Sequence, residues 1–204
     1  MKRPFVVAAL WGLSLGANAQ IKPVLYPKLS KTLDSLAYVD QWPMQQLFKQ
    51  QPDSAGRNLV QVEKENYARH QPVLEKIVRQ VGYPGFRQVG EKSSSNFWLL
   101  VQHADAHPEF QRQVLKLMLP EVKRKNASGV NYAYLIDRVA VGAGQPQEYG
   151  TQLEYKGPGI GKAVSRLLRD PKNVDKRRAA LGMEPLQQYL DMMTSMHEQM
   201  NKPK

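Results

Sequence analysis

The stretch WLLVQHADAHPEFQ, residues 98–111, decides the fold expected for this chain. It opens on consecutive apolar residues, a pattern that is typical of a helix buried on nearly all sides. His107-Pro108 then starts a second helix, because proline in the first turn of a helix loses no hydrogen bond. Two histidines and Asp105 lie between the two apolar runs. The sequence therefore predicts a central buried helix whose polar end forms one wall of any chemical site.

The beginning of the chain has the pattern of a signal peptide. Lys2 and Arg3 precede the apolar segment Phe5–Gly16, and Ala17-Asn18-Ala19 then supplies a cleavage motif. The apolar segment is shorter than a stable bilayer span, although a retained anchor is the alternative. We expect cleavage between Ala19 and Gln20, which predicts a periplasmic or secreted protein.

After cleavage the chain has the length of a single domain. We expect an extended, proline-containing leader over 20–30 and a single helical domain over 31–204. The sequence has no cysteine, which excludes disulfides and a lipid anchor on cysteine. No segment after the signal peptide is apolar enough to cross a membrane.

The formal net charge of the whole sequence is +11. It falls to +9 when Lys2 and Arg3 leave with the signal peptide. The basic residues are scattered and no nucleic-acid-binding motif is present, so no specific nucleic-acid partner is expected. The charge instead favours a solvated basic surface that is attracted to anionic envelope components.

Apolar residues recur at helical spacing through most of the chain. The spacing predicts helices over 31–50, 59–81, 97–103, 108–122, 131–141 and 184–200, with the capping residue of the third among Ser93–Asn96. Glu148–Tyr155 and Lys162–Arg169 are expected to be strands joined by a glycine-rich turn. The predicted fold class is mainly α: about six helices around a buried central helix, with one small β-hairpin near 148–169.

Two familiar kinds of site are poorly matched. The turn at Gly157–Gly161 lacks the glycine spacing of a phosphate-binding loop, and Ala163 replaces the required hydroxyl after Lys162. His103 and His107 are four residues apart, but Pro108 interrupts the helix that would bring them to one face. We therefore predict neither a metal nor a cofactor.

A composite site is the remaining hypothesis for chemistry. His103 is the candidate general acid or base, with Asp105 or Asp137 fixing its tautomer, and Arg138 is the candidate clamp for an anionic group. Further candidate ligand-binding residues are Gln102, Tyr149, Thr151 and Gln152. The alternative is structural. In that case Asp105 or His107 caps the helix that starts at Pro108, and Asp137 and Arg138 join an ion-pair network between a helix and the hairpin.

Two further residues have structural interpretations. His70 lies on an apolar helical stripe, which favours a core histidine over a ligand. Asn126-Ala127-Ser128 matches a glycosylation sequon in a predicted exposed loop over 123–129, although a three-residue match is weak evidence.

Four stretches together resemble the bacterial domain-of-unknown-function family 6624. They are FWLLVQHAD at 97–105, YLIDRV at 134–139, QEYGTQ at 147–152 and NVDKRRAALGMEPL at 173–186. The resemblance implies no known activity, but it adds Arg178 to the candidate ligand-binding residues. The chain departs from the family pattern at His107-Pro108, where Asp-Pro is expected, and this weakens the capping role of His107.

Two functions are consistent with these residues. The first is a binding or structural envelope module with a polar cluster around His103, Asp137 and Arg138, whose partner is an anionic envelope component or a small ligand. The alternative is a small hydrolase-like enzyme that uses His103 as general acid or base and Arg138 as the anion clamp. The sequence identifies neither the reaction nor the ligand.

Overall fold

A computed structural model describes residues 23–201 of the chain. The predicted signal peptide and the first residues of the predicted leader lie outside this range. The elements follow in the order α1 (Pro27–Phe48), α2 (Leu59–Val81), α3 (Phe86–Gln102), α4 (Pro108–Lys123), α5 (Gly129–Gly142), β1 (Leu153–Lys156), β2 (Lys162–Ser165), a 3-10 turn (Pro171–Asn173), α6 (Val174–Ala180) and α7 (Leu186–Met200). The fold is mainly α with one small hairpin, as predicted. No helix in the described range is both long and apolar enough to span a bilayer.

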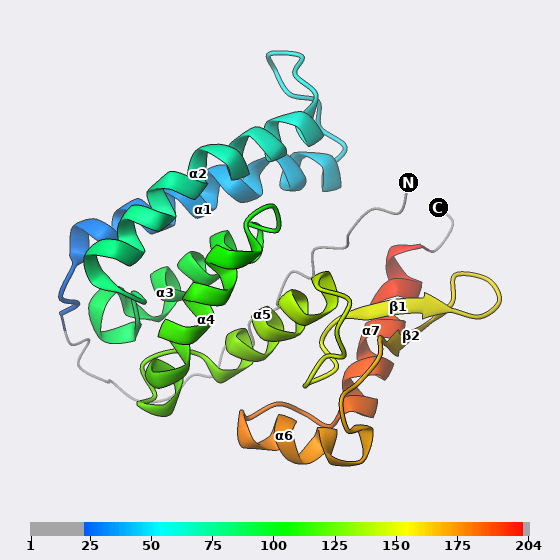
Figure 1. The fold of residues 1–204 in the computed structure, drawn as a ribbon. Coiled ribbons are helices and arrows are strands. Elements are labelled where there is room, and N and C mark those ends of the chain that lie inside the picture. The colour runs from blue at the N-terminus through cyan, green and yellow to red at the C-terminus, as the bar shows by residue number, and fades with distance from the viewer. Residues whose placement is uncertain (1–22, 202–204) are drawn as a thin grey trace.

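The main core lies among α1 to α5, and α3 is at its centre. Figure 1 shows α1 and α2 side by side, with α3, α4 and α5 beneath them. Phe97 and Val101 of α3 are fully buried against side chains such as Leu33 of α1 and Leu135 of α5. Each such burial contributes about 1.5–3 kcal/mol through the hydrophobic effect. The predicted central helix is confirmed.

Helix α3 begins earlier than predicted. It starts at Phe86 and is broken at Gly90, whose φ of +82° lies in the left-handed region that favours glycine. Ser93–Asn96 therefore lies inside the helix, and the prediction that it supplies the cap is wrong. The reason is a tertiary contact, because the Ser93 hydroxyl and the Asn96 amide donate hydrogen bonds to Asp34 of α1 at 2.8 Å each.

The loop that carries the predicted sequon is tightly packed. Asn126 is 2% exposed, and its side-chain amide donates hydrogen bonds to Gln88 and Glu121 while its side-chain oxygen accepts one from the backbone of Arg87. Gly85 lies so close that a Cβ atom there would be 2.5 Å from the backbone oxygen of Asn126. The prediction that Asn126 lies exposed in this loop is wrong.

The last third of the chain builds a second, smaller core. The strands β1 and β2 pair antiparallel, with Leu153 opposite Ser165, and α7 packs on β2 (Figure 1). Ala163, Tyr189 and Met193 are its buried members. The hairpin is shorter than the predicted strands at its open end, because the backbone N–H groups of Glu148, Tyr149 and Thr151 donate to Asp137 of α5 and do not form a regular ladder with 166–169. Helix α6 was not predicted.

Candidate functional site

Asp137 of α5 is the anchor for the segment that leads into the hairpin. Its carboxylate accepts hydrogen bonds from the backbone N–H groups of Glu148, Tyr149 and Thr151 at 2.7–3.0 Å, and from the Thr151 hydroxyl at 3.0 Å. Burial raises the pKa of Asp137, while these four donors act in the opposite direction. Because the side chain is fully buried and its oxygens are engaged, Asp137 organises the loop.

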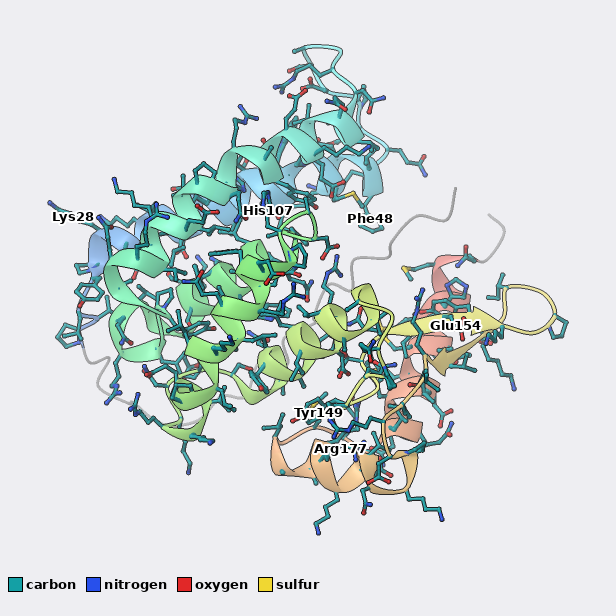
Figure 2. All side chains as sticks on the ribbon, viewed as in Figure 1. Lys28, Phe48, His107, Tyr149, Glu154 and Arg177 are labelled. Carbon is teal, nitrogen blue, oxygen red and sulfur yellow. The ribbon has the colours of Figure 1, made fainter. Side chains whose placement is uncertain are left out.

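Arg178 of α6 holds the same segment from the other side. It is fully buried, its guanidinium donates to the backbone oxygens of Tyr149 and Glu184 at 2.7 and 2.6 Å, and it lies over the ring of Tyr189. Figure 2 shows Tyr149 close to Arg177, whose guanidinium donates to the backbone oxygen of Glu148. Arg178 therefore makes structural contacts, although the sequence suggested it as a ligand-binding residue.

Asp105 and Arg138 form a two-pronged ion pair at the end of α3. The Nε and NH2 groups of Arg138 donate to the two carboxylate oxygens of Asp105 at 2.7 and 2.5 Å. Gln111 of α4 also donates to Asp105, and to the backbone oxygens of Val101 and Gln102 in the last turn of α3. The exposed fractions of the side chains are 24% for Arg138 and 57% for Asp105, so the pair is reachable from solvent.

His103 immediately follows α3 and is bound by a residue of α1. Its Nδ1 lies 2.7 Å from Oδ2 of Asp40, and both side chains are buried. At that distance the Nδ1–H donates to the carboxylate, which fixes the tautomer and leaves Nε2 as the basic nitrogen. Nε2 of His103 is buried and has no hydrogen-bond partner among residues 23–201. His103 thus has one ring nitrogen, Nε2, that is not hydrogen-bonded by the described residues.

A second histidine contacts the same carboxylate. Nδ1 of His70 on α2 lies 3.5 Å from Oδ1 of Asp40, and Gln41 donates a hydrogen bond to Oδ2 at 2.7 Å. Burial alone would raise the pKa of Asp40, but the hydrogen bonds from His103 and Gln41, together with the close approach of His70, outweigh burial and lower this pKa. Asp40 is therefore an ionised carboxylate between two imidazoles.

Tyr67 covers His103 on the side of α2. The two ring centroids are 4.8 Å apart, and the Tyr67 hydroxyl donates to Glu63 at 2.7 Å. Burial is the main cause that raises the pKa of Tyr67, so its hydroxyl stays protonated. Tyr67 is only half-buried, so the His103 ring lies behind a side chain that itself reaches the surface.

The predicted site residues therefore divide into two groups. Asp137, Thr151 and Arg178 build the junction between α5, the hairpin and α6, and the Gln152 amide donates to the Thr151 hydroxyl at 3.2 Å. His103, Asp105 and Arg138 lie at the end of α3, and Gln102 there accepts through its backbone. Asp40 is the partner of His103 Nδ1. It takes the role of fixing the tautomer, which the sequence analysis assigned to Asp105 or Asp137. His107 precedes α4 without a side-chain capping bond.

The comparisons with known proteins identify a family for this chain. The model of a family of unknown function, DUF6624, matches residues 27–200. The chain belongs to this family. No curated protein and no solved structure matches the chain.

The four stretches that suggested the family form a continuous series of contacts. The first is joined to the second by Asp105 and Arg138, and the second to the third by Asp137 and the backbone of residues 148–151. The third is joined to the fourth by Tyr149 and Arg178. These four stretches of the chain are thus linked by a polar framework that runs from α3 through α5 and residues 148–151 to α6.

Sequence reasoning missed Asp40 and left His70 as a core residue. Asp40 carried a signal, since it lies on the buried stripe of α1 that includes Leu33 and Ala37 at helical spacing. A carboxylate on such a stripe needs a buried partner. In the described part of the chain, no group of three or more acidic, histidine or cysteine side chains is arranged to hold a metal ion.

Proposed function

We propose that the chain is an exported, hydrolase-like enzyme in which His103 transfers the proton and Asp40 orients it. The observation that carries this proposal is the 2.7 Å contact from His103 Nδ1 to Asp40, which leaves Nε2 without a partner. Leaving a buried polar atom unpaired costs about 1–3 kcal/mol. A substrate or its attacking water would supply the missing partner.

The chemistry follows from this geometry. Nε2 accepts a proton from a water molecule while the water oxygen attacks the electrophilic centre of an ester. The imidazolium then returns that proton to the oxygen of the leaving group. The Asp40 carboxylate stabilises the imidazolium between the two steps, so it is a positioning residue that never contacts the substrate.

Access to His103 involves Tyr67 and Arg138. Because the ring of Tyr67 lies against that of His103, a substrate reaches Nε2 when the Tyr67 side chain rotates outward. Arg138 is bound to the exposed carboxylate of Asp105, and an anionic substrate group of similar geometry can replace that carboxylate. We infer that the preferred substrates are esters with an anionic group.

The experiment compares His103→Asn with His107→Asn. The asparagine amide at position 103 can still donate to Asp40 but has no basic nitrogen, whereas His107 is exposed and lies four residues away. The probes are p-nitrophenyl acetate, p-nitrophenyl phosphate and bis(p-nitrophenyl) phosphate. We expect His103→Asn to lower kcat/KM by at least about 100-fold, and His107→Asn to leave it unchanged. Equal activity in both variants would contradict the proposal.

A second candidate function is a binding module for a small anionic ligand or an anionic envelope component. It is favoured by the Asp105–Arg138 pair, a partly desolvated bidentate arginine that remains reachable from solvent. Thermal shift with phosphate and with citrate tests it, because a ligand of the native state raises Tm. We expect Arg138→Met to abolish the shift. Arg112→Met, which removes a comparable arginine from α4, should retain the shift.

Export is part of the proposal and has its own test. The charge pattern and the cleavage motif of residues 1–19 support it. Mass spectrometry of the protein from a bacterial periplasmic fraction or culture medium should give a chain that begins at Gln20. An intact N-terminus in the cytosolic fraction alone would contradict export.

A further inference from the structure

Three helices bring one carboxylate and two imidazoles together in the core. Asp40 lies on α1, His70 on α2 and His103 at the end of α3. The exposed fractions of their side chains are 1%, 7% and 4%. We call these residues the His70–Asp40–His103 cluster. The proposed function uses one of its imidazoles and leaves the other without a role.

Both imidazoles approach the carboxylate through Nδ1, one at each oxygen. His103 lies 2.7 Å from Oδ2, whereas His70 lies 3.5 Å from Oδ1. Oδ1 is buried and has no hydrogen-bond partner in the part of the chain described. His70 is a cation-forming group within ion-pair distance of this oxygen, so a proton on His70 would draw the carboxylate toward it.

Counting charges limits how many protons this cluster can hold. One imidazolium beside one carboxylate is neutral overall, whereas two leave a net positive charge in the core, which is costly. Asp40 is the one carboxylate within ion-pair distance of either imidazole among the described residues. His70 and His103 therefore compete for the same counter-charge.

The charged groups around the cluster do not remove this competition. From α2, Tyr67 contacts His103 and passes its hydroxyl hydrogen bond to Glu63. From the end of α3 and from α5, Asp105 and Arg138 pair with each other. Among the described residues, Asp40 is thus the carboxylate that directly contacts the two imidazoles and balances their charge.

We propose that His70 is a positioning residue that controls the proton occupancy of His103 by sharing Asp40 with it. When His70 is neutral, Asp40 supports the imidazolium that His103 forms during proton transfer. When His70 is protonated, its charge occupies Asp40 and disfavours a second imidazolium at His103. The two histidines then titrate as a coupled pair and not as independent groups. The catalytic consequence rests on the proposed function, but the coupling itself does not.

The test is an NMR titration of the histidine ring signals between pH 5 and pH 9. The chain has four histidines, so single substitutions assign each signal. In the wild type, we expect the curves of His70 and His103 to have two steps each. In His70→Asn, which keeps a donor toward Asp40 but cannot titrate, His103 should titrate in one step. Its midpoint should rise by about one pH unit, a tenfold gain in proton affinity. His107→Asn should leave the His103 curve unchanged.

A single-step His103 curve in the wild type would overturn the proposal. If His70→Asn folds and its His103 curve superimposes on the wild-type curve, the proposal is also overturned. Hydrolysis of the p-nitrophenyl probes is measured separately. Coupled titration in a protein without hydrolytic activity would support the proton sharing and contradict the proposed enzymatic function. Independent titration in a hydrolytically active protein would contradict the proton sharing and support the proposed enzymatic function.

Discussion

At the scale of single residues, Arg178 is the largest fully buried side chain in the described structure. Among the described residues, no fully buried carboxylate forms an ion pair with it. Glu184, its ion-pair partner at 3.3 Å, is 44% exposed, and backbone oxygens accept the shorter hydrogen bonds of the guanidinium. A planar guanidinium can reach two carbonyl oxygens at once, which a lysine ammonium cannot do with the same geometry.

We therefore expect Arg178→Lys to destabilise the protein by about 3 kcal/mol, since it leaves a buried cation with incomplete partners. Arg79→Lys, at an arginine that is 65% exposed, is the control and should change the free energy of unfolding by less than about 0.5 kcal/mol. Urea denaturation of both variants measures the difference. Equal stabilities would show that the contacts of Arg178 contribute little.

The residues of the candidate site could be predicted only in part from the sequence. His103 and Arg138 stood out because they lie in short, unusual polar groups at the ends of apolar runs. Asp40 did not, because its partner His103 is 63 positions away and no local pattern pairs them. Likewise, the sequence could not show that the Asp137 carboxylate would be occupied by backbone groups of residues 148–151.

At the scale of elements, Asp34 provides several of the polar contacts between α1 and α3. It accepts hydrogen bonds from Ser93 and Asn96, and from Lys92 at 3.2 Å. Burial would raise its pKa, but the hydrogen bonds from Ser93, Lys92 and Asn96 and the charge of Lys92 lower it below the ordinary value. A carboxyl with a lowered pKa stabilises the fold above the ordinary value, and this stabilisation is lost as the pH falls through the lowered value.

Asp34→Asn should consequently cost about 1 kcal/mol at pH 7, a modest value because the side chain is partly exposed. The cost should shrink when the pH is lowered below about 4, because a protonated aspartate then resembles asparagine. Chemical denaturation at pH 7 and at pH 3 gives both values. A cost that is the same at both pH values would contradict the assigned role of the charge.

Amphipathic spacing located the long helices well. Helix α2 has the predicted bounds, α4 starts at the predicted proline, and α7 begins two residues after the predicted start. The spacing could not locate α6 or the true ends of the strands. These depend on Asp137 and Arg178, which hold residues 147–152 by contacts that are distant in the sequence.

At the scale of the whole molecule, α5 joins the two cores. Tyr134 on this helix has edge contacts with Trp98 of the main core and with Tyr189 of the smaller core, at centroid distances of 6.4 and 6.3 Å. One turn further along the same helix, Asp137 holds the segment that enters the hairpin. These two connections between the cores, one apolar and one polar, thus both lie on α5.

Weakening Asp137 should uncouple the two cores. We expect Asp137→Asn to lose at least two of the four hydrogen bonds and to cost about 2–4 kcal/mol. In a chain that begins at Gln20 and so lacks Trp11, the tryptophans are Trp42 and Trp98 of α1 and α3. Their fluorescence reports on the main core, whereas far-UV circular dichroism reports on all helices. The two signals should coincide during denaturation of the wild type and separate in the variant.

Asp191→Asn provides the control, because Asp191 is an exposed aspartate of α7 that is bonded only to Gln187 among the contacts described. Its two denaturation signals should coincide as they do in the wild type. Coincident signals in Asp137→Asn as well would mean that the apolar contacts of Tyr134 are sufficient to keep the molecule cooperative.

The enclosed side chain of Asn126 has a consequence for producing this protein in a eukaryotic secretory host. Oligosaccharide is attached there to the nascent chain, before Gln88 and Glu121 can close around the amide. A sugar at this position would prevent the approach of Gly85 and stop the turn from α4 to α5 from forming. Bacterial hosts without this modification, or a Ser128→Asp chain that lacks the acceptor motif but keeps an oxygen to cap α5, should therefore give a higher yield of folded material.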